Sequence, residues 1–413
     1  MQIGPLDAAA ARPQRRRSAT AAPQAARQET RPTTTHTEYP RRHPVGLHMS
    51  EITTPTPAST RTALVVGASG ITGSALVTKL VADGWQVLSL SRSARSEAGV
   101  RGIAADLLDP ASLRAALAGE APTHVFFTAW QRRATEAENI AVNSAMVRDL
   151  LSALDHAPVE HVALVTGLKH YLGPFEAYAA GEMPDTPFHE DEPRLDTPNF
   201  YYAQEDELFE AAARQGFTWS VHRSHTVIGH AVGNAMNMGL TLAVQAALVN
   251  ERGADFVFPG SEAQWNGLTD MTDAGVLAEQ MVWAATDPAG RDEAFNIVNG
   301  DVFRWRWMWP RLAALLGVPA ERVVGFVDAP RPLEVQMRDL EADWPAIAEK
   351  HGLVERDISR LASWWHTDAD LGRDMEVVTD MGKSRDAGFL VFKRTEQAFA
   401  DLFARYRADR LIP

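Results

Sequence analysis

The chain has 413 residues, 45% of them hydrophobic, which is enough to bury one large core or two modest ones. Its formal net charge of −13 argues against nucleic acid and anionic membrane surfaces as partners, because both would repel the chain. The absence of cysteine excludes disulfides, thiolate nucleophiles and zinc–thiolate sites, and no apolar run approaches the ~18–20 residues that span a bilayer. We therefore expect a soluble, cytoplasmic protein.

The first 60 residues differ in composition from the rest of the chain. They are rich in Arg, Thr, Pro and Ala and poor in large aliphatic residues, with runs such as Arg15-Arg16-Arg17. Such a segment cannot bury enough surface to offset the entropy of ordering it, so we expect a disordered tail over residues 1–60. A start assigned upstream of the true initiator, Met49, would account for the tail, and an Arg-rich, acid-poor transit peptide is the alternative interpretation.

From residue 62 onward, short apolar runs alternate with segments of helical length. Most of the apolar runs are nearly continuous, which is typical of strands buried on both faces of a parallel sheet. The alternation predicts an α/β fold, a Rossmann-type doubly wound sheet. The strands are expected at residues 62–68, 86–91, 102–106, 124–128, 161–166, 218–223 and 294–298, and the intervening helices include 74–82, 111–117 and 135–154.

Two regions break this alternation. Residues 168–198 contain five prolines and no periodic pattern, so we expect a long active-site loop over 168–200. From about residue 300 the chain becomes mostly helical and rich in tryptophan, and most of these tryptophans should pack between helices. The sequence thus predicts a dinucleotide-binding domain over 61–300 and a smaller helical, substrate-binding part over 301–413.

Three glycines follow the first expected strand, in the sequence GASGITG over residues 67–73. Gly67 permits a tight turn, Gly70 lets the backbone approach a pyrophosphate, and Gly73 lets the next helix pack against the strand. The phosphates would then lie at the helix N-terminus, where free N–H groups and the helix dipole favour negative charge. Because the pattern lies between a strand and a helix, it predicts a dinucleotide site.

The end of the second expected strand indicates which dinucleotide binds. An NAD-binding domain usually places an acid there, whereas this chain has Ser91-Arg92-Ser93. Arg92 can pair with a 2′-phosphate, with Ser93 as a supporting donor, so NADP(H) is favoured. A solvated loop arginine is the alternative. Asp106, at the end of the third expected strand, should meet the adenine edge.

The usual catalytic pair of a short-chain dehydrogenase, a tyrosine followed four residues later by a lysine, is missing. Glu205 follows Tyr201 at that spacing, and Asp206 follows Tyr202. Either catalysis has been lost or the lysine comes from elsewhere. Lys169 is the candidate, because it follows the strand over 161–166 at the sheet edge where ligands bind, although a lysine in that place is by default a solvated loop residue.

The segments around Lys169 and Tyr201 carry a family resemblance: they are GLKHYLGPFE over 167–176 and NFYYAQED over 199–206. Further matching segments are THVFFTAW over 123–130, WSVHR over 219–223, EAFNIVNGD over 293–301 and GFLVF over 388–392. In these motifs, which occur in the right order, the chain resembles the progesterone 5β-reductase/iridoid synthase-like (PRISE) family. Members of this family are atypical short-chain reductases of activated C=C bonds.

The resemblance implies NADPH as hydride donor and a small-molecule enone or enal as substrate. It implies a lysine–tyrosine pair, Lys169 and Tyr201, with Tyr202 as the alternative tyrosine. Phe175, Tyr178 and Trp130 are expected at the substrate. Asn234, Ala235 and Met236 match a segment that touches the cofactor phosphates. The full cofactor set expected is Gly67, Ser69, Gly70, Ile71, Gly73, Arg92, Ser93, Asp106, Leu107, Ala129, Trp130, Val165, Tyr201, Val227, Asn234, Ala235 and Met236.

Two other functions stay open on the sequence. One is an extended short-chain carbonyl reductase or sugar-nucleotide epimerase, which the missing Tyr-x-x-x-Lys pair disfavours. The other is a non-catalytic NADP(H) sensor that acts through a partner protein. A metal is not expected, because the thirteen histidines are scattered and form no helix-face pair beside carboxylates. A homodimer is compatible with the sequence.

Overall fold

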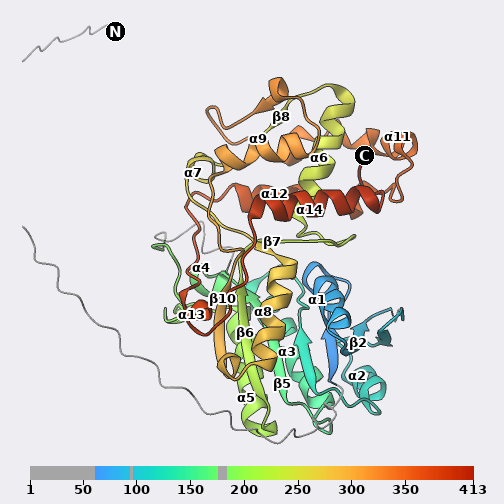
Figure 1. Cartoon of the computed structure of the whole chain (residues 1–413), viewed down its shortest axis with the longest axis vertical. Coiled ribbons are helices and arrows are strands. Elements are labelled where there is room, and N and C mark those ends of the chain that lie inside the picture. Colours follow the sequence, from blue (N-terminus) through green and yellow to red (C-terminus); the bar gives the residue numbers. More distant parts are fainter. Residues whose placement is uncertain (1–60, 94–95, 175–183) are drawn as a thin grey trace, which may run out of the picture. The chain divides into compact units, whose positions relative to one another are not determined.

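Seven parallel strands form one sheet in the order β10-β6-β5-β4-β1-β2-β3 (Figure 1). All seven expected strands are present, with small shifts at their ends. The order reverses between β1 and β4, which is the point where ligands bind in doubly wound sheets. The strands are β1 (Thr62–Val66), β2 (Gln86–Ser91), β3 (Val100–Ala104), β4 (His124–Phe127), β5 (His161–Gly167), β6 (Thr218–Ser224) and β10 (Glu293–Ile297).

The structure is a computed structural model that describes residues 61–93, 96–174 and 184–413. The expected tail over 1–60 and two residues expected at the substrate, Phe175 and Tyr178, lie outside the described residues. Within those three ranges, no helix is both long and apolar enough to cross a membrane.

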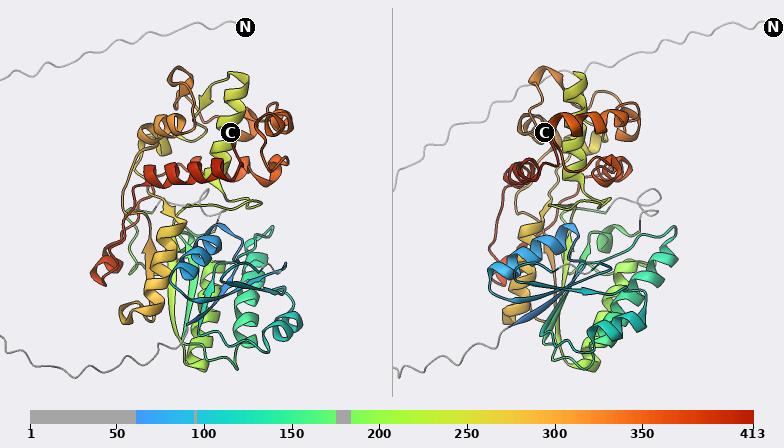
Figure 2. Two further views of the ribbon diagram at one scale, coloured as in Figure 1. Left: turned by 45° about the vertical axis from the view of Figure 1, so that its right-hand side comes forward. Right: turned by 90° about the vertical axis from the view of Figure 1, so that its right-hand side faces the viewer.

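Helices cover both faces of the sheet, as Figure 2 shows. Alternate residues of β1 point to opposite faces, so Ala63 and Val65 pack in one buried cluster while Leu64 and Val66 pack in another. This two-sided burial explains why the strands are nearly continuous apolar runs. One face carries α1 (Ile71–Ala82) and α8 (Ala274–Thr286), and the other carries α2 (Pro110–Leu117), α3 (Glu136–Ala153) and α5 (Phe200–Gln215).

A second large core lies among the C-terminal helices, and it contains the fully buried Trp305, Trp309 and Trp344. The predicted packing role of the tryptophans is confirmed for Trp305 and Trp309. This core also includes α6 (Met238–Arg252), which belongs to the range expected for the dinucleotide-binding domain. A single boundary at residue 300 therefore does not describe the packing. The helices of this core include α6 (Met238–Arg252), α9 (Trp305–Leu315), α11 (Trp344–His351), α12 (Trp364–Leu371) and α14 (Thr395–Ala408).

The segment expected as one long loop begins with a helical turn, α4 (Lys169–Leu172). Leu168, Tyr171 and Leu172 have helical spacing and are buried together with Phe188. One turn is too short to give a recognisable period, which is why the loop prediction was wrong at this point. The remaining short elements are β7 (Val227–Ile228), β8 (Phe256–Val257), α7 (Glu262–Asn266), β9 (Thr272–Asp273), β11 (Val323–Val324), α10 (Leu333–Gln336), α13 (Gly382–Asp386) and the 3-10 turns Pro288–Gly290, Ala320–Arg322, Glu341–Asp343 and Ile358–Arg360.

Candidate active site

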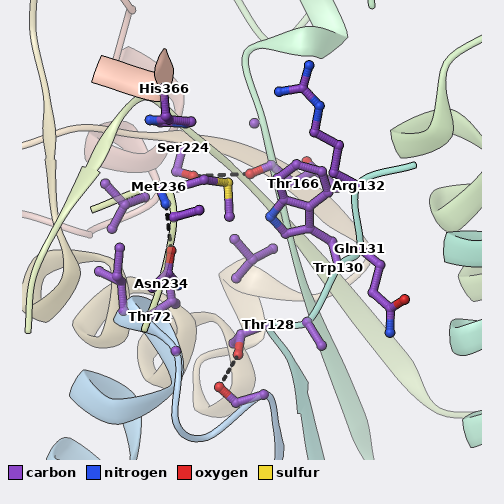
Figure 3. Close-up of a pocket in the computed structure, with 18 of the residues that line it drawn as sticks. Thr72, Thr128, Trp130, Gln131, Arg132, Thr166, Ser224, Asn234, Met236 and His366 are labelled. Carbon is purple, nitrogen blue, oxygen red and sulfur yellow. Dashed lines mark hydrogen bonds between the residues drawn. The ribbon is translucent and has the colours of Figure 1, made fainter. Parts of the chain in front are cut away.

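A cavity of about 840 Å³ lies at the carboxyl ends of β1, β4, β5 and β6, where the strand order reverses. Figure 3 shows Trp130, Gln131 and Arg132 on one side of it and Asn234 and His366 on the other. Most of the residues predicted for the site are brought together here. They are Gly67, Ser69, Gly70, Ile71, Arg92, Asp106, Leu107, Ala129, Trp130, Val165, Lys169, Tyr201, Val227, Asn234, Ala235 and Met236.

The glycine turn has the geometry that the sequence pattern requires. Gly67 has φ of +83°, a conformation that favours glycine. A Cβ placed on Gly73 would lie 2.2 Å from the carbonyl oxygen of Gly67, so only glycine lets α1 pack this closely. Gly73 thus lies behind the turn rather than on the cavity. The first turn of α1 contains no acidic residue, and no described side chain caps it, so its N–H groups can receive an anion.

Asn234 extends this polar end of the cavity from a distant part of the chain. Its side-chain oxygen accepts the N–H of Met236 at 2.9 Å, which fixes the orientation of the amide. The amide nitrogen then faces the glycine turn, 3.9 Å from where a Cβ on Gly70 would lie. An N–H donor beside a helix N-terminus adds to the anion-binding character of this end.

The ends of β2 and β3 supply the next group of cavity residues. Arg92 lines the cavity directly after β2, as predicted for a 2′-phosphate partner. The serine that lines the cavity is Ser91, whereas Ser93 is exposed and uses its carbonyl oxygen to accept the Ser91 hydroxyl at 2.7 Å. Asp106 lies two residues beyond the end of β3 and accepts the N–H of Leu108 at 3.0 Å.

Lys169 and Tyr201 come from different elements and line the same cavity. Lys169 is only 8% exposed, and burial lowers its pKa to about 7, partly opposed by Glu136. The Tyr201 hydroxyl lies against Gly167 at the end of β5, 3.3 Å from where a Cβ on that glycine would be. That Cβ would also lie 2.9 Å from the carbonyl oxygen of Ser224, so a larger residue at position 167 would force the backbone of β6 or the Tyr201 hydroxyl to move. The sequence pattern did not point to this glycine.

One buried side chain, Asn199, connects the two predicted catalytic residues. Its Nδ2 donates to the carbonyl oxygen of Lys169 at 2.7 Å, and its Oδ1 accepts the N–H of Tyr201 at 2.9 Å. The second bond is also the N-cap of α5, a role in which Asn is strongly favoured. Asn199 is 2% exposed, so its contacts fix the start of α5 relative to α4.

Tyr202, the alternative tyrosine, points away from the cavity. Its hydroxyl donates to the carbonyl oxygen of His170 at 2.5 Å and accepts the N–H of Leu195 at 3.0 Å. Glu205, at the position of the usual catalytic lysine, is buried and accepts from Arg194 at 2.8 Å. Burial raises the pKa of Glu205, while the neighbouring arginines oppose that shift. The structure therefore places Tyr201, and not Tyr202, on the cavity.

Trp130 is held in place by an aromatic stack at the end of β4. Its ring lies parallel to that of Phe200, with centroids 5.4 Å apart and planes inclined by 17°. The N–H of Phe200 donates to Glu136 Oε1 at 2.7 Å, so α3 also supports this stack. We call the cavity residues that follow β1, β4 and β5, including Trp130 and Lys169, the strand-end wall.

The opposite wall comes from α12 and the residues just after it. We call it the α12 wall, and sequence reasoning missed it, because no local pattern shows that this helix, packed on α6 and α10, also lines the cavity. The same holds for His225, which directly follows β6 and also lines the cavity. Arg132, on the strand-end wall, was missed as well; it packs over the ring of Trp365 at 4.6 Å. The α12 wall consists of Trp365, His366, Ala369, Asp370 and Arg373.

The α12 wall is held by a chain of polar contacts. Asp270 Oδ1 pairs with His225 Nδ1 at 2.8 Å, and His225 Nε2 lies 2.8 Å from Arg373 Nη1. Arg373 Nη2 then donates to Asp370 Oδ1. Asp370 Oδ2 accepts the hydroxyl of Thr226 at 3.1 Å. In the part of the chain that the structure describes, no group of three or more His, Cys, Asp or Glu side chains is placed to hold a metal ion.

A family model described as a PRISE-like Rossmann-fold domain matches residues 111–413. The chain belongs to the PRISE-like family. It is therefore an oxidoreductase of the short-chain dehydrogenase/reductase superfamily, as the sequence predicted.

Two relatives from this family cover most of the chain. The (S)-8-oxocitronellyl enol synthase of Nepeta cataria is 36% identical over 366 residues, which are 85% of this chain and 93% of that enzyme. The 3-oxo-Δ(4,5)-steroid 5-beta-reductase of Arabidopsis thaliana is 36% identical over 365 residues, with the same two coverages. Among solved structures, UDP-glucose 4-epimerase of Thermotoga maritima has a TM-score of 0.61 at 15% identity over 84% of this chain and 99% of its own. That likeness shows the extended short-chain dehydrogenase fold alone.

Proposed function

We propose that this protein is an NADPH-dependent reductase that adds hydride to the β-carbon of an α,β-unsaturated ketone or aldehyde. The observation that carries the proposal is the presence of Lys169 and Tyr201 in one cavity with the glycine turn. The place of the usual lysine is taken by Glu205, which binds Arg194 instead. The relative from Arabidopsis supports the proposal, because a 3-oxo-Δ(4,5)-steroid is an α,β-unsaturated ketone.

The residues at the sheet edge fit an NADP(H) molecule. The N-terminus of α1 and Asn234 would receive the pyrophosphate, and Arg92 would pair with the 2′-phosphate. Val165 and Val227 line the cavity beyond them, where the nicotinamide would lie. Once bound, the cofactor supplies a hydride. Side chains of this chain would hold the substrate and stabilise the charge that develops on it.

Tyr201 and Lys169 would act on the charge that develops in the substrate. When hydride reaches the β-carbon, the C=C electrons move toward the carbonyl and an enolate oxygen forms. The Tyr201 hydroxyl donates a hydrogen bond to that oxygen, in the manner of an oxyanion hole. The protonated amine of Lys169 stabilises the same charge and lowers the pKa of the tyrosine. Protonation of the α-carbon from solvent completes the saturated product.

The test is an activity panel with NADPH and three acceptors: 2-cyclohexenone, progesterone and a simple enal. We expect NADPH consumption with at least one of them and a loss of about 100- to 1000-fold in kcat for Tyr201→Phe. Tyr202→Phe is the matched control, because it removes a neighbouring hydroxyl that points away from the cavity.

Three results would count against this proposal. The first is the absence of any NADPH consumption together with a Tyr201→Phe variant that behaves like wild type. The second is a preference for a saturated ketone or turnover of a UDP-sugar, which would favour the carbonyl reductase or epimerase alternative. The third is tight NADPH binding without hydride transfer to any acceptor, which would favour the sensor.

A further inference from the structure

Glu136 is a partly buried carboxylate that joins the first turn of α3 to the start of α5. Its Oε1 accepts the N–H of Phe200, the first residue of α5, at 2.7 Å. Its Oε2 accepts from Asn139 Nδ2 at 3.0 Å, and Oδ1 of that asparagine accepts the N–H of Arg133 at 2.7 Å. Two bonds from neutral donors thus fix the carboxylate of Glu136 without cancelling its negative charge.

The first two N–H groups of α5 have side-chain acceptors from different parts of the chain. Asn199, the N-cap, accepts the N–H of Tyr201 and also donates to the carbonyl oxygen of Lys169. An N-cap side chain reaches the second or third N–H of its helix, so the first one, on Phe200, needs another acceptor. Glu136 supplies it, and a negative charge is favourable at a helix N-terminus. Glu136 therefore holds the residue directly before Tyr201.

The field of Glu136 also reaches the amine of Lys169. The described charged and titratable groups around that amine are Glu136, Tyr201, His366, Asp370, Arg132 and Arg373. Burial is the main cause that lowers the pKa of Lys169 to about 7, and among the described charges Glu136 opposes this shift most. Asp370 opposes it less and is ion-paired with Arg373, whose charge offsets its own.

Glu138, in the same turn of α3, shows what a carboxylate with only a capping role looks like. Its Oε2 accepts the N–H of Thr135 at 3.1 Å, and its own N–H donates to the Thr135 hydroxyl at 3.3 Å. These two bonds form the capping box of α3. Glu138 is exposed, and it is not among the charges that shift the pKa of Lys169. Glu136 differs because it reaches a second helix and the lysine.

We propose that Glu136 is a positioning residue for the reductase reaction: it keeps the amine of Lys169 protonated and holds Tyr201 at the cavity. This inference rests on the proposed reductase function. Glu136 does not line the cavity, so both effects act through other groups. The protonated amine is the form that stabilises the enolate. Glu136 therefore sets the upper end of the pH range in which the protein is active.

The first test is the pH profile of kcat/KM for Glu136→Gln with the best acceptor of the activity panel. Glutamine keeps an oxygen for the N–H of Phe200 but removes the charge. We expect the alkaline decline to begin at lower pH, with kcat/KM about 3- to 10-fold below wild type at pH 8 and within about twofold at pH 6. Glu138→Gln is the matched control and should follow the wild-type profile, because glutamine also suits a capping box.

A second variant, Glu136→Leu, removes the acceptor as well as the charge. The N–H of Phe200 then loses its bond, and Tyr201 is held less well. We expect kcat about 10-fold below that of Glu136→Gln even at pH 6, where most of the Lys169 amine is charged in the wild type. NADPH affinity is the check that both variants fold.

Denaturant unfolding gives a readout that needs no turnover. In the folded wild type the amine of Lys169 is mostly charged at pH 6 and neutral at pH 9, so its attraction to Glu136 stabilises the fold only at the lower pH. Glu136→Gln should therefore lose more stability at pH 6 than at pH 9, whereas Glu138→Gln should change equally at both.

The results that overturn the inference differ from those that overturn the function. A Glu136→Gln profile that superimposes on the wild type, or an equal loss of stability at the two pH values, rules out a role for Glu136 in the charge of Lys169. A Glu136→Leu variant with the kcat of Glu136→Gln at pH 6 rules out the positioning of Tyr201. If the wild type reduces no acceptor, the proposed function fails, and the unfolding comparison alone decides the part about Lys169.

Discussion

Lys169 on the strand-end wall and Arg373 on the α12 wall are buried basic side chains in the same cavity. The surroundings of Arg373 stabilise its charge, whereas those of Lys169 disfavour the charged form. Arg373 is ion-paired with Asp370 and donates to a histidine that Asp270 holds in turn. Around Lys169, burial outweighs the favourable field of Glu136, and the pKa falls to about 7. An ion pair whose two charges offset each other suits recognition of a ligand, whereas a strongly shifted pKa is typical of a catalytic group.

This contrast predicts that removing charge from the two walls has opposite effects on stability. Asp370→Leu leaves Arg373 buried without its carboxylate, so we expect the free energy of unfolding to fall by about 3–5 kcal/mol. The double variant Asp370→Leu/Arg373→Leu should recover most of that loss, because no lone charge stays buried. Denaturant unfolding of both variants measures the effect. Equal destabilisation by the single and double variants would show that Asp370 and Arg373 do not stabilise each other's charge.

Lys169→Met should have the reverse profile. The charged amine is disfavoured by the fold, so its removal should leave the free energy of unfolding unchanged or higher at pH 6. The same change removes positive charge from the developing enolate, and we expect kcat to fall by an amount equivalent to about 2.7–4 kcal/mol. Steady-state kinetics and denaturant unfolding on one preparation provide both numbers. A destabilised but active variant would show that Lys169 has a structural role only.

Arg92, which lines the cavity after β2, extends the comparison to the cofactor end of the cavity. There a cation should bind its ligand without contributing to the stability of the fold. We expect Arg92→Ser to raise the KM for NADPH about 10- to 100-fold, since a hydrogen bond to a charged group is lost. The KM for NADH, which has no 2′-phosphate, should change little. The ratio of the two KM values is the measurement, and the thermal midpoint is the control. A parallel rise for both cofactors would mean that Arg92 does not recognise the 2′-phosphate.

The two walls also differ in how far the sequence predicts them. Gly67, Arg92 and Lys169 each follow a strand whose apolar run is visible in the sequence, and the carboxyl ends of parallel strands meet at one edge. Tyr201 needed the family resemblance and its spacing from Lys169, and Tyr202 stayed open as the alternative because alignment to the usual Tyr-x-x-x-Lys helix would select it. His366 and Asp370 have helical spacing but no local mark of function. Their place depends on how a helix almost two hundred residues after Lys169 packs against α6 and α10, so that one of its sides lines the cavity.

Per pH unit, the smallest expected effect is the pH dependence that Lys169 imposes. Its ordinary pKa is 10.5 and its pKa in the folded chain is about 7, so the unfolded chain binds more protons between these two values. The contribution of Lys169 to the free energy of unfolding therefore rises as pH increases from 7 toward 10.5. Activity should move the other way, because kcat/KM reports ionisation in the free enzyme, and about a tenfold loss is expected for each pH unit above 7.

Two variants isolate this effect. Lys169→Arg stays charged throughout the range, so its remaining activity should be flat where the wild type declines. Lys169→Met should abolish the rise in stability over the same interval. If wild-type kcat/KM stays level up to pH 9, or if Lys169→Arg declines in parallel with it, then another group controls the titration. In that case the amine of Lys169 would be charged in the working enzyme, as the guanidinium of Arg373 is. The two walls would then not differ in the charge of their cations.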